Sequence, residues 1–146
     1  MLQNDINSKG NTQWFYFSVH NLPTNLDITF NIINLTKSDS LFNYGMQPAV
    51  FSKLGNKKNG QGWYRTGKDV SYYKNNIKRE NSRRYLYTLT FKIRPQFQGD
   101  TIFISHCFPY SYSSLKEYMD SIVKSPYRKN FVQRSIIGKT VGNQNL

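Results

Sequence analysis

The side chains best suited to metal or nucleophilic chemistry are two histidines and one cysteine, His20, His106 and Cys107. A zinc site needs several His, Cys, Asp or Glu side chains within reach of one ion. His106 and Cys107 are adjacent on an expected strand, so their side chains point to opposite faces and cannot converge on one ion or form a Cys–His pair. Neither an H-E-x-x-H nor an H-x-x-E motif occurs. The sequence therefore predicts no metal and no cofactor in this chain, and it predicts His106 to be partly buried and hydrogen-bonded.

Candidate residues for acid–base catalysis and for phosphate binding are also few. Paired carboxylates must lie close together to divide acid and base roles. The chain has eight acidic residues, and its two glutamates, Glu80 and Glu117, both lie in charged, exposed contexts. No glycine-rich phosphate loop and no dinucleotide fingerprint are present. We therefore expect no catalysis from the chain as given.

Net charge is the strongest chemical signal. Twenty Lys and Arg against eight Asp and Glu give a formal charge of +12 over 146 residues. Such an imbalance implies an acidic partner, and nucleic acid, an anionic membrane and the acidic tails of other proteins all have the required sign. No stretch approaches the length of a membrane span, which argues against an integral membrane protein, and we expect no membrane partner. The single cysteine excludes an internal disulfide and fits a reducing compartment.

The cations form two clusters, which are our candidate sites for an acidic partner. The first comprises Lys78, Arg79, Arg83 and Arg84, and the second comprises Lys124, Arg128, Lys129, Arg134 and Lys139. Two tyrosine-containing runs, 72–74 and 127–129, have the composition to stack on bases and neutralise phosphates. The simpler interpretation is that these tyrosines belong to strands or the core and that the cations form a solvated face.

The elements that must position these residues are mostly strands, because apolar residues recur with a period of two. Strands are expected at 13–20, 26–35, 49–51, 62–65, 70–74, 85–94 and 101–107. The last two are expected to pair as a hairpin across the turn at Gly99, and 53–60 and 74–84 are expected to be loops.

One helix is predicted near the end of the chain. Ser114 and Glu117 form a capping-box pattern, and an apolar stripe from Leu115 to Val123 follows with helical spacing. Ser125 and Pro126 should end this helix. Short strands at near-regular spacing with one late helix predict an antiparallel β-sandwich, a mainly β fold with one short C-terminal helix.

Seven blocks in series resemble the cytosolic carboxypeptidases, zinc metallocarboxypeptidases that trim glutamate from tubulin tails. They are residues 12–17 (TQWFYF), 30–35 (FNIINL), 40–48 (SLFNYGMQP), 62–63 (GW), 72–76 (YYKNN), 87–91 (YTLTF) and 106–113 (HCFPYSYS). They are similar to the N-terminal β-sandwich domain of that family. Residues 134–143 (RSIIGKTVGN) look like the segment that leads into its catalytic domain.

The resemblance implies a division at residue 126. Residues 1–126 are expected to form the β-sandwich, lacking its first strand or strands, and residues 127–146 a linker toward the catalytic domain. The zinc ligands and the catalytic glutamate of the family would lie beyond Leu146, so the zinc would belong to that absent domain.

In such relatives the domain is implied to pack on the catalytic domain, to help it fold and to shape access to its cleft. The residues expected at this interface are Asn43, Tyr44, Pro109, Tyr110 and Tyr112. An internal aromatic corner of the sandwich is an equally weighted interpretation of the same residues. The basic clusters would attract acidic tubulin tails or microtubules, with the cytoplasm, cytoskeleton and cilium as expected locations.

Three functions remain open from sequence. The first is a non-catalytic accessory domain of a tubulin-trimming carboxypeptidase. The second is a free-standing structural or axoneme-associated protein built on the same sandwich. The third is a nucleic-acid-binding subunit of a ribonucleoprotein, which charge supports but for which no RNA-module signature is present.

Overall fold

The computed structural model describes residues 12–80 and 82–145, which fall into two compact units divided between Phe108 and Pro109. The trimmed start expected from the resemblance lies outside the described residues. The division expected at residue 126 stays a prediction. Each unit is described by itself below.

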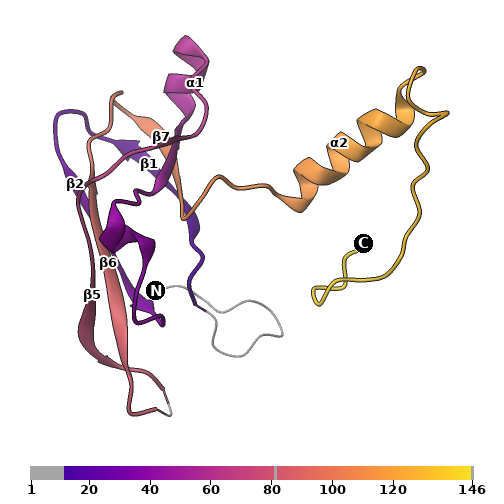
Figure 1. Ribbon diagram of the computed structural model, residues 1–146. Coiled ribbons are helices and arrows are strands. Elements are labelled where there is room, and N and C mark those ends of the chain that lie inside the picture. Colours follow the sequence, from indigo (N-terminus) through magenta and orange to yellow (C-terminus); the bar gives the residue numbers. More distant parts are fainter. Residues whose placement is uncertain (1–11, 81, 146) are drawn as a thin grey trace. The chain divides into compact units, whose positions relative to one another are not determined.

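The first unit contains two antiparallel sheets (Figure 1). Its strands are β1 (Tyr16–Leu22), β2 (Ile28–Leu35), β3 (Ala49–Ser52), β4 (Tyr64–Arg65), β5 (Lys68–Lys78), β6 (Tyr85–Ile93) and β7 (Asp100–Ser105). One sheet has the order β1-β7-β3-β4 and the other has the order β2-β6-β5, with every pair antiparallel. The predicted mainly β, antiparallel sandwich is confirmed.

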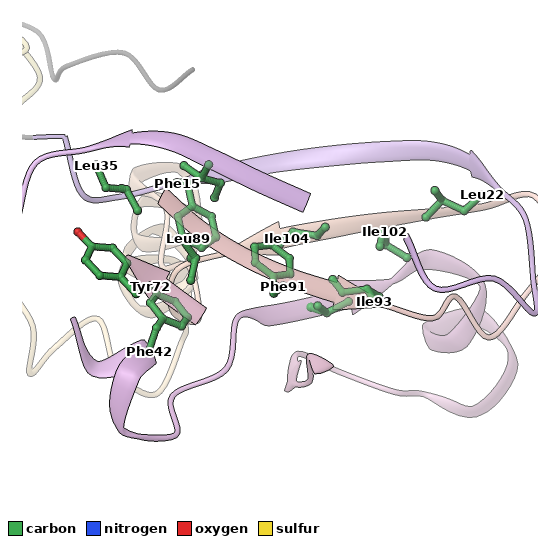
Figure 2. Close-up of a cluster of buried hydrophobic side chains, with 12 residues drawn as sticks. Phe15, Leu22, Leu35, Phe42, Tyr72, Leu89, Phe91, Ile93, Ile102 and Ile104 are labelled. Atoms are coloured by element: carbon green, nitrogen blue, oxygen red, sulfur yellow. The ribbon is translucent and has the colours of Figure 1, made fainter. Parts of the chain in front are cut away.

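The core forms because one face of each principal strand is apolar. Leu89 and Phe91 of β6 have no exposed surface, and Phe15, directly before β1, and Ile104 of β7 are buried with them. Phe15 stacks on Phe91 with ring centroids 6.5 Å apart, and Figure 2 shows these side chains gathered in one cluster between the sheets. Burying each such side chain stabilises the fold by about 1.5–3 kcal/mol. The alternation of apolar residues predicted for 85–94 therefore falls on β6, the strand that contributes Leu89 and Phe91 to the core.

The predicted hairpin between the last two strands is wrong. β6 pairs with β2 and β5, whereas β7 pairs with β1 and β3 in the other sheet. The turn expected at Gly99 is present, with φ at 70°, but it carries the chain from one sheet to the other. Periodicity specifies which face of a strand is buried, not which strand lies beside it, and this explains the error.

Two segments predicted to be loops contain regular structure. Residues 53–60 hold the helix α1 (Lys53–Asn59), which begins after Ser52 and ends at Gly60 in the left-handed conformation. β5 extends to Lys78, four residues beyond the strand end expected at residue 74, so the first part of the loop predicted over 74–84 is strand. A short 3₁₀ helix, η1 (Leu41–Tyr44), also follows β2.

The second unit contains the predicted late helix, α2 (Tyr112–Lys124), which ends at Ser125 as expected. Its first turn differs from the prediction because the N-cap is Ser111, whose Oγ accepts the N–H of Ser114 at 3.1 Å. The Tyr112 hydroxyl donates to the carbonyl of Asn145 at 3.2 Å, and Arg134 pairs with Asp120. No helix within 12–80 and 82–145 has the length and apolar character needed to cross a bilayer.

Candidate anion-binding site

A concave surface of about 690 Å³ lies beside the turn that joins β5 to β6. We call it the basic hollow. Its lining residues are Thr36, Lys37, Ser38, Lys74, Arg79, Arg83, Arg84, Tyr85 and Tyr87. Five of these nine side chains are cations and none is acidic. Figure 1 shows the β5–β6 hairpin, which supplies most of the lining, projecting beyond the ends of the other strands.

The three arginines of the hollow are held by the turn of the hairpin. The Arg79 N–H donates to the Arg84 carbonyl at 2.9 Å, which closes the turn across its base. The Ser82 N–H donates to the Arg79 carbonyl at 3.2 Å, and the Arg84 N–H donates to the Ser82 Oγ at 3.1 Å. These bonds fix the backbone from which the guanidinium groups extend, so like charges that repel one another are kept together.

Lys37 reaches the hollow from the segment after β2, and Tyr72 of β5 anchors that segment. The Tyr72 hydroxyl donates to the Lys37 carbonyl at 2.7 Å, and its ring stacks on Tyr87 with centroids 5.6 Å apart. Burial raises the pKa of Tyr72 to about 12, so the hydroxyl keeps its proton and remains a donor throughout the physiological range. In Figure 2 this hydroxyl is directed away from the apolar cluster.

Lys74 completes the cationic lining from the middle of β5. Its Nζ lies 4.5 Å from the centre of the Tyr85 ring, a cation–π contact within the hollow itself. At an exposed site such a contact contributes about 0.5–1 kcal/mol, enough to favour one position of a flexible side chain. The ammonium group is therefore held over the ring of Tyr85, which lines the hollow together with Tyr87.

The structure brings together part of the first predicted cluster and adds two residues to it. Arg79, Arg83 and Arg84 all line the hollow, while Lys78 lies on β5 outside the lining. Lys37 was not predicted because it is remote from the cluster in sequence and only the fold brings it close, whereas Lys74 lies five positions before Arg79 but was not assigned to the cluster. The sole local signal was the Tyr72-Tyr73-Lys74 run, in which Tyr72 is indeed a core residue.

The second predicted cluster belongs to the second unit. Lys124, Arg128 and Lys129 are exposed, with Lys124 in the last turn of α2. Arg134 forms an ion pair with Asp120, so part of its charge is compensated within the unit.

The predicted interface residues are also divided between the units. In the first unit, Asn43 Oδ1 accepts the Tyr72 N–H at 3.3 Å, which covers part of the outer edge of β5. Tyr44 is 75% exposed and donates its hydroxyl to Asp39 at 3.1 Å, a bond that raises the pKa of Tyr44. In the second unit, Tyr110 is 70% exposed, and Pro109 and Tyr112 lie beside it in sequence. Whether these residues meet a partner stays a prediction.

His106 lies in an aromatic environment. Its ring is half-buried, 5.5 Å from the Phe42 ring centre and 5.6 Å from that of Phe15. Burial, with Arg65 and Lys37 as nearby cations, lowers the pKa of His106 and favours the neutral ring. His20 instead hydrogen-bonds to Ser18 and Thr101 on β1 and β7. Across the residues that the structure describes, no three His, Cys, Asp or Glu side chains gather closely enough to hold a metal ion.

Comparison with known proteins gives a consistent family. No protein-family model matches the chain. The chain is 39% identical over 145 residues to cytosolic carboxypeptidase 2 of Danio rerio, and the match covers 96% of this chain and 20% of the relative. It is 36% identical to cytosolic carboxypeptidase 3 of Mus musculus (94% of this chain, 13% of the relative) and to cytosolic carboxypeptidase 1 of Gallus gallus (98% and 12%).

The chain thus spans a fifth or less of the length of these relatives, while almost all of its own length takes part in each match. The homologous stretch contains both the sandwich and the hairpin that carries the hollow. The resemblance seen in the sequence blocks is confirmed, and the chain belongs to the cytosolic carboxypeptidase family as a β-sandwich domain of it.

Proposed function

We propose that this chain is a non-catalytic accessory domain of a cytosolic carboxypeptidase, and that its basic hollow holds part of an acidic peptide such as the glutamate-rich tail of tubulin. The observation that carries the proposal is the convergence of five cations on one concave surface whose described lining residues include no acid. The cations come from three places in the chain, the segment after β2, the middle of β5 and the β5–β6 turn. Such an arrangement costs stability through repulsion and is favoured when a polyanion is bound.

The lining has donors that suit carboxylate groups. Arginine presents a planar fork of donors that can bind a carboxylate through two hydrogen bonds, and lysine adds a compact point charge. The hydroxyls of Thr36 and Ser38 supply neutral donors on the same surface. An extended acidic peptide would therefore bind through several separate hydrogen-bond donors along the hollow rather than through a single enclosed pocket.

The division of labour follows from the same proposal. The zinc ion and the residues that cleave the peptide bond would belong to the catalytic domain of the enzyme, and this chain would act by contact. The proposal also includes two roles for this chain: it packs on the catalytic domain, and it retains the acidic tail near the cleft of that domain. Its proposed locations are the cytoplasm, the cytoskeleton and the cilium.

Binding of a fluorescent oligoglutamate peptide, followed by anisotropy, tests the proposal. The triple variant Arg79→Glu, Arg83→Glu and Arg84→Glu should lose at least about tenfold in affinity, roughly 1.4 kcal/mol. A matched triple variant, Lys57→Glu, Lys68→Glu and Lys116→Glu, changes the net charge equally at exposed positions that do not line the hollow. This control should lose less than about threefold, because exposed charges are screened at physiological salt.

Equal losses in the two triple variants would show that net charge alone attracts the peptide, and the assignment of the hollow would be abandoned. An RNA oligonucleotide of equal charge serves as a second ligand. If it bound much more tightly than the peptide, the nucleic-acid function would replace the one proposed.

A further inference from the structure

A serine lies among the arginines at the turn of the β5–β6 hairpin. Ser82 is exposed, with Arg79 three residues before it and Arg83 and Arg84 directly after it. No other serine in the sequence has three arginines within three positions. The same three arginines line the basic hollow, so a change of charge at Ser82 acts on that surface.

We propose that Ser82 is a phosphorylation site and that its phosphate switches the basic hollow off. This inference rests on the proposed binding of acidic peptide at the hollow. A protein kinase would transfer the γ-phosphoryl group of ATP to the Ser82 Oγ. The bond between the γ-phosphorus and the bridging oxygen breaks, the Oγ–phosphorus bond forms, ADP leaves, and the hydroxyl proton passes to the base of the kinase.

The local geometry suits a phosphate at this position. The Ser82 Oγ accepts the N–H of Arg84 at 3.1 Å, and this bond leaves the hydroxyl proton uncommitted. After transfer, the same backbone N–H is placed to donate to a phosphate oxygen, and the neighbouring guanidinium groups supply the strong paired donors that phosphate prefers. A phosphoserine carries about −1.5 to −2 charges at pH 7, enough to offset two of the five cations in the hollow.

The surroundings of Ser82 also suit the approach of a kinase. Basic residues before the serine match a kinase whose substrate groove is acidic, because opposite charges steer and align the substrate. The ladder between β5 and β6 has a register shift between Lys74 and Lys78, close to the turn. A hairpin end with irregular pairing opens at lower cost than the centre of a sheet, so the turn can adopt the extended form that a kinase binds.

The test begins with the full chain, ATP and a purified serine/threonine kinase that prefers arginine before its target. We expect one phosphate per chain, located at Ser82 by fragmentation mass spectrometry, and no incorporation in Ser82→Ala. Oligoglutamate binding to the phosphorylated chain should then be weaker by about five- to tenfold than before phosphorylation, while the affinity of Ser82→Ala should be the same with and without kinase treatment. Phosphoserine placed at position 82 during synthesis provides a second route to the same species.

The outcomes separate the two proposals. If the unmodified chain binds the peptide and the phosphorylated chain binds it equally well, the switch is overturned and the hollow remains a binding site. If the unmodified chain fails to bind at all, the proposed function falls and the switch falls with it. Incorporation at other serines but not at Ser82 also overturns the inference.

Discussion

At the scale of single residues, Tyr72 links the core to the basic hollow. Its ring is buried against Tyr87, and its hydroxyl is the group that holds the Lys37 carbonyl. Tyr72→Phe keeps the ring and removes this hydrogen bond, which should lower the free energy of unfolding by about 0.5–1.5 kcal/mol. Because Lys37 is then less well placed, oligoglutamate affinity should fall by about two- to fivefold. Urea denaturation and anisotropy measure the two effects.

The matched control is Tyr73→Phe on the same strand. The Tyr73 hydroxyl shares a hydrogen bond with Thr90 at 3.2 Å, but that bond is exposed to solvent and lies outside the hollow. We expect its loss to change stability by less than about 0.5 kcal/mol and to leave peptide affinity unchanged. Equal effects of the two substitutions on affinity would contradict the role assigned to Tyr72.

His106 should make the stability of the first unit dependent on pH. Its pKa in the folded chain lies below the ordinary value of 6.5, so the unfolded chain binds the proton more readily. The contribution of neutral His106 to the free energy of unfolding is therefore fully present above about pH 6.5. It is lost as the pH falls from there through the lowered pKa. Urea denaturation at pH 7.5 and at pH 5.5 should show a drop that is absent in His106→Gln.

Two carboxyl groups with lowered pKa values affect stability only at a lower pH than His106 does. Asp27 and Asp39 have lowered pKa values, caused chiefly by the hydrogen bonds from Arg94 and from the Ser40 backbone. Their contributions are lost only below about pH 4, where unfolded carboxyl groups take up protons. A drop of the same size in wild type and His106→Gln between pH 7.5 and pH 5.5 would mean that another group is responsible.

At the scale of elements, the helix α1 depends on one buried carboxylate of β7. Asp100 is 1% exposed, and its two oxygens accept the Ser52 hydroxyl at 2.5 Å and the Leu54 N–H at 3.0 Å. The Ser52 Oγ in turn accepts the Gly55 N–H at 2.7 Å. Asp100→Ala leaves these donors buried without an acceptor, which should lower the free energy of unfolding by about 2–4 kcal/mol. Guanidinium denaturation measures it.

Asp27→Ala is the matched comparison for Asp100→Ala. Asp27 also accepts two hydrogen bonds, but both come from the exposed side chain of Arg94. Removing one partner of an exposed ion pair costs less than about 1 kcal/mol. If the two substitutions cost the same, the buried carboxylate is not what holds the start of α1.

This dependence explains why α1 could not be predicted from its own residues. Lys53–Asn59 contains glycine and two asparagines, which are poor helix formers. The acceptor that helps fix its first turn is more than 40 residues away in sequence. The core strands, in contrast, were predictable because each carries its own alternation of apolar residues, and only their pairing needed information from the whole chain.

The candidate site divides in the same way. Arg79, Arg83 and Arg84 form a charge run that any reading of the sequence detects. Lys37 joins them because Tyr72 ties the segment after β2 to β5, a contact between residues 35 positions apart, whereas Lys74 is a residue of β5 itself. A charge run predicts where a polyanion is attracted, whereas the fold determines which cations share one surface.

At the scale of the whole molecule, four of the eight acidic side chains are committed to contacts with residues that do not line the hollow. Ion pairs join Asp69 to Lys92, Asp27 to Arg94 and Asp120 to Arg134, and Asp100 is buried beneath α1. None of the nine described residues that line the hollow is acidic. A formal charge of +12 therefore has opposite consequences for folding and for binding. Repulsion among the cations lowers the stability of the fold, whereas their attraction for polyanions favours binding.

Salt should separate these two consequences. Raising NaCl from about 50 mM to about 300 mM shortens the Debye length by more than half, so oligoglutamate affinity should fall by about tenfold or more. Over the same range the free energy of unfolding should rise slightly, because repulsion among the cations is screened as well. The triple glutamate variant of Arg79, Arg83 and Arg84 should show a much flatter salt dependence of its residual binding. Affinity that did not change with salt would mean that apolar contacts, rather than the charges of the hollow, hold the peptide.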